Sequence, residues 1–133
     1  MKANTQTISI EAAPSRVLGL VADPMNLPRW AVGFARAVRP DGERWIVSTG
    51  GGEIGLQVHA NRAAGTVDFR LQPAPGVEAL AAARVIPRGA QSEFVFTQFQ
   101  SPGMPDEAFQ ASVDALGHEL KVLKALAEVE CPL

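Results

Sequence analysis

One acidic side chain lies where acid–base chemistry inside a cavity would need it. Apolar side chains recur at spacings of three and four over residues 109–127, and on a helical wheel Glu119 and Ser112 fall at one border of this stripe. A carboxyl buried at such a border has a raised pKa and can act as an acid or a base, or hold the polar end of a ligand. A carboxyl that bends into water or pairs with a basic side chain does neither. Glu119 is therefore the weak catalytic candidate of this sequence, and both alternatives stay open.

Two further side chains accompany this candidate. Gln98 alternates in register with Phe94 and Phe96, so its amide either points inward or satisfies backbone groups. Trp30 follows a short helical stretch, where its ring would either close or line the mouth of a cavity or simply pack in the core. The two residues are predicted to contribute to a binding site.

Other kinds of chemistry find little support in the residue types. His59 and His118 fall on the expected outer faces of different elements, and the single cysteine, Cys131, cannot form an internal disulfide or a cysteine cluster. The glycines at 50–52 lack the Lys-Ser/Thr of a phosphate-binding loop and open no helix. We expect no metal site and no cofactor, and the absence of tyrosine removes a common proton donor.

Composition bounds the class of protein. The 133 residues carry 12 Lys and Arg against 14 Asp and Glu, a net charge of -2, without a block of like charges that would attract nucleic acid or an anionic membrane. Residues 1–10 lack the apolar centre of a secretory signal, and no apolar run approaches the roughly 20 residues of a membrane span. We expect a single domain over residues 1–133, located in the cytoplasm, that binds neither nucleic acid nor membrane.

The elements that must position these side chains follow from periodicity. Residues 5–10 alternate as a strand, Pro14 opens a helix, and residues 25–30 form a second short helical turn. The pattern then keeps a period of two until residue 100, with turn residues between the apolar runs. The predicted strands are residues 34–38, 44–49, 53–60, 66–72, 77–86 and 92–100. Asp106 and Glu107 favour the start of a long helix that carries the apolar stripe.

The faces of these strands predict which side chains line an interior. Gln57, His59, Asp68 and Arg70 alternate with apolar residues and should form a solvated outer face, whereas residues 79–83 are rich in alanine and leave volume on the inner face. Close approach of a helix would explain the small residues equally well. The predicted ligand-binding residues are Trp30, Leu56, Val58, Phe69, Ala81, Ala83, Phe96, Gln98, Ser112, Leu116, Glu119 and Leu120.

The order of elements favours one architecture: an α+β helix-grip, with a curved seven-stranded antiparallel sheet around the C-terminal helix and two short helices between the first two strands. In residues 8–14, in Ala22-Asp23-Pro24 with the following 27–30, and in the terminal helix, the chain resembles the START-like, or SRPBCC, superfamily and its polyketide cyclase/dehydrase group. The resemblance implies an internal pocket between sheet and helix. Relatives use this pocket to bind lipids, hormones and polyketides, to catalyse cyclisation or dehydration, or dock partner proteins instead.

Three hypotheses for function remain. The first is a binder of a small, largely apolar molecule. The second is an enzyme of the cyclase/dehydratase kind, in which Glu119 with Gln98 or Ser112 steers proton transfer on an enolisable substrate. The third is a co-chaperone-like module that docks a protein partner. Whether the chain forms a homodimer is left open.

Overall fold

A computed structural model describes residues 2–129, which form one seven-stranded antiparallel sheet and three α-helices. In chain order the elements are β1 (Ala3–Ile10), α1 (Pro14–Ala22), the 3-10 turn η1 (Pro24–Asn26), α2 (Leu27–Trp30), β2 (Ala37–Asp41), β3 (Arg44–Thr49), β4 (Gly52–Asn61), β5 (Thr66–Ala74), β6 (Val77–Arg88), β7 (Gln91–Phe99) and α3 (Asp106–Glu128). The strand order is β1-β7-β6-β5-β4-β3-β2. The predicted helix-grip architecture is confirmed.

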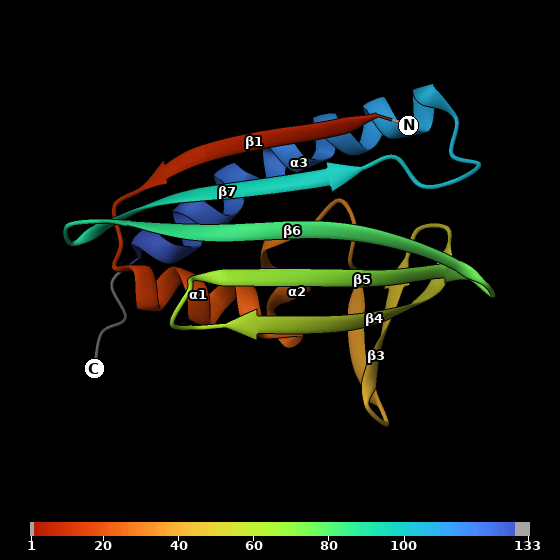
Figure 1. Cartoon of the computed structure of the whole chain (residues 1–133), viewed down its shortest axis with the longest axis horizontal. Coiled ribbons are helices and arrows are strands. Elements are labelled where there is room, and N and C mark those ends of the chain that lie inside the picture. Colours follow the sequence, from red (N-terminus) through yellow and green to blue (C-terminus); the bar gives the residue numbers. More distant parts are fainter. Residues whose placement is uncertain (1, 130–133) are drawn as a thin grey trace.

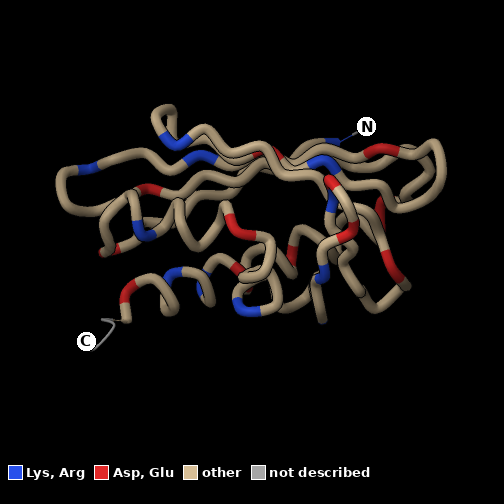
Figure 2. The backbone as a smooth tube through the Cα atoms, turned by 90° about the horizontal axis from the view of Figure 1, so that it is seen from below, with Lys and Arg blue, Asp and Glu red and all other residues tan. Residues whose placement is uncertain are grey.

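The helices all cover the same face of the sheet. Figure 1 shows α3 running behind β1 and β7, while α1 and α2 lie behind β4, β5 and β6. In the same view β3 turns away from the line of its neighbours, so the sheet curls around the helices. In the view turned by 90° the sheet and the helices form two layers (Figure 2). The core lies between these layers, and α3 packs against β1 and α2.

The short helices form where proline and polar capping groups favour them. Pro14 occupies the first turn of α1, where its missing N–H costs no hydrogen bond, and Val17, Leu18 and Val21 are buried as their shared face predicts. Asp23 ends this helix, and its carboxylate accepts the backbone N–H of Met25 at 3.0 Å. The predicted second helical turn is present as η1 followed by α2.

One predicted strand begins too early. Residues 34–38 were expected to be extended, but β2 begins only at Ala37. The chain continues to turn after α2, because the backbone N–H groups of Phe34 and Ala35 both donate to the carbonyl of Ala31, at 3.0 and 2.8 Å. A mostly apolar run of five residues cannot distinguish such a turn from a strand.

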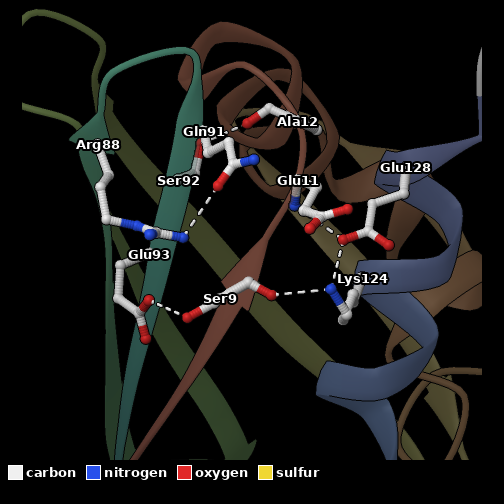
Figure 3. Close-up of polar contacts among 9 residues, drawn as sticks. All are labelled: Ser9, Glu11, Ala12, Arg88, Gln91, Ser92, Glu93, Lys124 and Glu128. Atoms are coloured by element: carbon white, nitrogen blue, oxygen red, sulfur yellow. Dashed lines mark hydrogen bonds and ion pairs between the residues drawn. The ribbon is translucent and has the colours of Figure 1, made fainter.

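The C-terminal end of α3 is attached to the start of the chain by polar contacts (Figure 3). Lys124 Nζ donates to the backbone carbonyl of Ser9 at 3.1 Å and also pairs with the Glu128 carboxylate, which accepts the N–H of Glu11 at 2.8 Å. Arg16 donates to the last carbonyls of the helix, reaching Ala127 O at 2.6 Å and Val129 O at 2.8 Å. The Arg16 guanidinium thereby satisfies carbonyls at the helix end that have no partner within the helix.

Charge is spread over the surface without separation by sign. Lys and Arg are interspersed with Asp and Glu over both layers in Figure 2. The outer face of the sheet carries Gln57, His59, Asp68 and Arg70 as exposed side chains, which confirms the predicted solvated face. None of the helices within residues 2–129 combines the length and the apolar character needed to cross a membrane.

Candidate functional site

A cavity of about 280 Å³ lies between the inner face of the sheet and the N-terminal half of α3. Its walls come from β4 to β7, from α2 with the turn that follows it, from residues 101–104, and from one face of α3. Ala79 and Ala81 of β6 and Ala115 of α3 are among the wall residues. These small side chains leave space where larger ones would fill it.

The structure brings together most of the predicted site. Nine of the twelve predicted ligand-binding residues line the cavity: Trp30, Leu56, Phe69, Ala81, Phe96, Gln98, Ser112, Leu116 and Glu119. They come from α2, from four neighbouring strands and from α3. The inward face of β7 predicted the position of Gln98, and the border of the apolar stripe predicted Ser112 and Glu119.

Val58, Ala83 and Leu120 lie outside the cavity lining. All three pack in the hydrophobic core, with Ala83 and Leu120 only 5% and 2% exposed. The reason is α1, which lies under the sheet near the end of β4 and contacts β4, β6 and β7 there (Figure 1). Its side chains fill the space that would otherwise continue the cavity toward this end. The alternation of a strand identifies an inward face but does not say how far along it the cavity extends.

Glu119 is buried inside the protein. The side chain lines the cavity, and only 6% of the residue is exposed. Its Oε2 accepts the backbone N–H of Gly33 at 2.9 Å. Within residues 2–129 no basic side chain forms an ion pair with it. Of the possibilities considered from the sequence, the buried carboxyl is therefore the one present. A carboxyl bent into water and a carboxyl paired with a basic side chain are both wrong.

The environment of Glu119 changes its protonation. Burial raises the pKa of the carboxyl from its ordinary value of 4.5 to about 7, because the charged form loses hydration. The backbone N–H groups of Gly33 and Phe34 oppose this rise, since both stabilise the carboxylate. A carboxyl with a pKa near neutrality can both give and take a proton, which is the property of a general acid or base.

Gly33 allows the close approach that makes this contact. A Cβ atom at this position would lie 3.2 Å from the Cβ of Ala115 and 3.4 Å from Glu119 Oε2. The first distance is tighter than most carbon contacts and the second is an ordinary contact, so a side chain here would need a small shift of Ala115. Gly33 therefore gives the turn after α2 room to approach α3, where its backbone N–H reaches Glu119.

Two further polar atoms in the wall residues are buried without a partner. Neither Trp30 Nε1 nor Gln98 Oε1 has a hydrogen bond within the described part of the chain. Trp30 is 2% exposed and packs edge-on against Phe94 and Phe96, with ring centroids 6.4 Å away in both pairs. Of the two alternatives considered for Trp30, packing in the core is the one that the structure shows, and the ring does not lie at the cavity mouth. Buried polar groups usually have partners, so these two require an explanation.

Several wall residues were not predicted. Phe109 belongs to the same apolar stripe as Leu116, one heptad earlier, so the periodicity could have found it. Met104 lies in the loop before α3, where no periodic signal exists. Gly33 acts through its backbone N–H, which every residue type except proline possesses, so its residue type gives no signal. Leu80 and Phe99 line the cavity although they are 44% and 41% exposed, so they form its rim.

No group of three or more His, Cys, Asp or Glu side chains converges in residues 2–129 in a way that could hold a metal ion. His59 and His118 are both exposed and lie on β4 and α3. Cys131, expected to be a tail thiol without function, falls outside the described residues.

Solved structures share this fold at low sequence identity. An aromatase/cyclase, ZhuI from Streptomyces sp. R1128, is 19% identical, with 96% of this chain and 93% of that chain covered and a TM-score of 0.75. A START superfamily protein from Mycobacterium smegmatis is 15% identical, with 95% and 97% covered and a TM-score of 0.69. The Aha1 dimer from Colwellia psychrerythraea is 18% identical, with 97% and 98% covered and a TM-score of 0.72.

These identities establish a common fold and nothing more specific. No curated protein sequence matches the chain. A family model does match, and it covers residues 1–128, which is nearly the whole sequence and includes every wall of the cavity. The chain therefore belongs to the family described as polyketide cyclase/dehydrase and lipid transport.

Proposed function

We propose that the protein binds a small, largely apolar molecule in the cavity between the sheet and α3. The observation that carries this proposal is the cavity itself, about 280 Å³ in volume and walled mainly by aliphatic and aromatic side chains. Ligand pockets begin at roughly 300 Å³, and a cavity of about 150 Å³ holds one benzene ring. The ligand would therefore have the size of about two fused rings.

An empty space of this size would be costly if it served no purpose. Without an occupant, its apolar wall residues lack the burial that larger neighbouring side chains would give them. Larger residues at the alanine positions of β6 would remove the cost, and the family described above includes proteins of lipid transport. The small residues at these positions therefore support a binding role.

Native mass spectrometry of gently purified protein tests the proposal. A retained small molecule would appear as a mass above that of the bare chain and would disappear on denaturation. The matched variants are Ala81→Leu, which fills the cavity, and Ala82→Leu, which adds the same atoms on the other face of β6. We expect Ala81→Leu to lose the retained molecule, or a naphthalene probe added to apo protein, and Ala82→Leu to keep it. Equal binding by both variants would contradict the proposal.

A second candidate function is favoured by Glu119. A buried carboxyl with a pKa of about 7 in the cavity wall has the position and the proton affinity of a general acid or base. Such a group would suit a cyclase/dehydratase reaction, in which a proton is moved on an enolisable substrate. With a turned-over substrate in hand, Glu119→Gln should lower kcat by about a hundredfold or more while KM changes little. Full activity of Glu119→Gln would eliminate this candidate.

The hypothesis that the protein docks a protein partner has less support from the structure. Leu80 and Phe99 are exposed apolar side chains, but both belong to the cavity rim, and ligand entry accounts for their exposure. A homodimer is the remaining form of this hypothesis. Sedimentation of the purified chain over a range of concentrations would detect it.

A further inference from the structure

Glu119 is the one acidic side chain of the cavity wall, and no positive charge lies with it. The lining includes no Lys, Arg or His, and its other polar side chains, those of Gln98, Ser101 and Ser112, carry no charge. Within residues 2–129 the pKa of Glu119 responds to burial and to backbone N–H groups of the turn after α2, and no charged side chain of any neighbouring element contributes. An ionised Glu119 is therefore a buried charge without a counter-charge, which is an unfavourable state.

One oxygen of this carboxylate is open to a ligand. Gly33 donates to Oε2 at 2.9 Å, whereas the N–H of Phe34 makes its hydrogen bond to a backbone carbonyl. In the part of the chain that the structure describes, no donor is hydrogen-bonded to Oε1. The buried atoms that lack both a partner and accessible surface there are Trp30 Nε1 and Gln98 Oε1, and Glu119 Oε1 is not one of them. Because Glu119 lines the cavity, its Oε1 can be reached from the cavity, and a carboxylate oxygen only accepts.

The apolar part of the wall also suits a cation. Six of the eight aromatic side chains of the protein line the cavity: Trp30, Phe34, Phe69, Phe96, Phe99 and Phe109. The faces of aromatic rings are electron-rich and attract ammonium groups, and this attraction grows when the cation is removed from water. A single carboxylate in a wall of aromatic rings therefore matches a ligand that combines rings with one positive charge.

We propose that the cavity binds a molecule of one or two rings that carries a protonated primary or secondary amine, with the ammonium group donating to the carboxylate of Glu119. The inference rests on the proposed binding function and assigns its ligand class. Folding has already removed the carboxylate from water, so only the ammonium group loses hydration on binding, and a charge-assisted hydrogen bond is strong in such surroundings. An anionic molecule of the same shape would meet a like charge and no counter-charge.

Three probes of similar shape test the ligand class: 2-naphthylmethylamine, 2-ethylnaphthalene and 2-naphthoate, which are cationic, neutral and anionic. Dissociation constants are measured by equilibrium dialysis at about pH 8, where Glu119 is mostly ionised and an alkylammonium group keeps its proton. We expect the amine to bind at least about tenfold more tightly than 2-ethylnaphthalene, and 2-naphthoate to bind more weakly than either.

The pH dependence of binding has a predicted sign. With a pKa of about 7, the ionised fraction of the free Glu119 carboxyl falls from about 90% at pH 8 to about 3% at pH 5.5. Binding of the ammonium group at the lower pH must first displace the carboxyl proton, so the dissociation constant of the amine should rise by about tenfold or more. That of 2-ethylnaphthalene should change little. A ligand that accepts a hydrogen from protonated Glu119, such as 2-acetylnaphthalene, would show the opposite trend.

Two variants assign the effect to its residue. Glu119→Gln keeps the size of the side chain and removes its charge, so it should bring the ratio of the amine and 2-ethylnaphthalene constants close to one and abolish the pH dependence. Retained binding of 2-ethylnaphthalene shows that the cavity of this variant is intact. Glu43→Gln makes the same exchange in the exposed turn between β2 and β3, outside the lining, and should leave both the ratio and the pH dependence unchanged.

The outcomes separate this inference from the proposed function. If 2-ethylnaphthalene binds and the amine binds no more tightly at about pH 8, or if 2-acetylnaphthalene or 2-naphthoate binds best, the inferred ligand class is overturned while apolar binding in the cavity stands. A preference for the amine that survives in Glu119→Gln also overturns it. If none of the probes binds, the proposed binding function fails together with the inference.

Discussion

The pH dependence of stability tests the burial of Glu119. Folding raises the pKa of this carboxyl from 4.5 to about 7, so between these values the folded state holds a proton that the unfolded state has released. The contribution of this group is therefore fully present below pH 4.5 and is lost as the pH rises through about 7. Each pKa unit corresponds to about 1.4 kcal/mol, which sets an upper limit of about 3 kcal/mol. Water that reaches the cavity screens the carboxylate, so we expect a loss of about 1–3 kcal/mol.

Glu119→Gln isolates this effect. The glutamine keeps a carbonyl oxygen that can accept the N–H of Gly33, but it cannot ionise. Urea unfolding from about pH 5 to about pH 8 should show the wild-type protein losing stability relative to the variant by about 1–3 kcal/mol. Asp106 and Glu128 have lowered pKa values, so their contributions are lost only as the pH falls and lie below this window.

The control is Glu43→Gln, in the exposed turn between β2 and β3. Its free energy of unfolding should follow that of the wild-type protein at every pH. Parallel curves for wild-type protein and Glu119→Gln would refute the reasoning, because a carboxyl that titrates alike in both states contributes no pH dependence. A direct titration of the Glu119 carboxyl by carbon-detected NMR would then be expected to give an ordinary pKa.

Two further substitutions test the supports of the fold. Arg16→Met removes the donors to the last carbonyls of α3 and should lower the free energy of unfolding by about 1–3 kcal/mol, whereas exposed Arg62→Met should change it by less than about 0.5 kcal/mol; urea titration distinguishes them. Gly65→Ala combines a φ of +72° with a Cβ only 2.6 Å from Val85 O, so it should be clearly more destabilising than Gly42→Ala, which has a φ of +63° but open space and should cost about 1 kcal/mol. Equal thermal midpoints for the two alanine variants would contradict this reading of the contact.

The sequence determined the architecture because that information is periodic and local. The spacing of three and four over α3 and the alternation of β4 to β7 identified the elements and their inward faces. Gln98 follows Phe94 and Phe96 at every second position of β7, and this alternation indicated that it could face the interior. Proline at residue 14 located the start of α1. The error at residues 34–36 arose where a short apolar run is compatible with both a turn and a strand.

The tertiary structure decided the extent and the chemistry of the cavity. Whether a carboxyl at the border of a helix stripe meets water, a basic side chain or a backbone N–H depends on which segment packs against it, and here that segment is Gly33, 86 residues away in sequence. The boundary of the cavity is likewise set by α1, which fills the space beneath Val58 and Ala83. Periodicity states which face of an element is buried. Only the packing of distant elements decides whether the buried face meets another side chain or an open space, because that depends on the shapes of both partners.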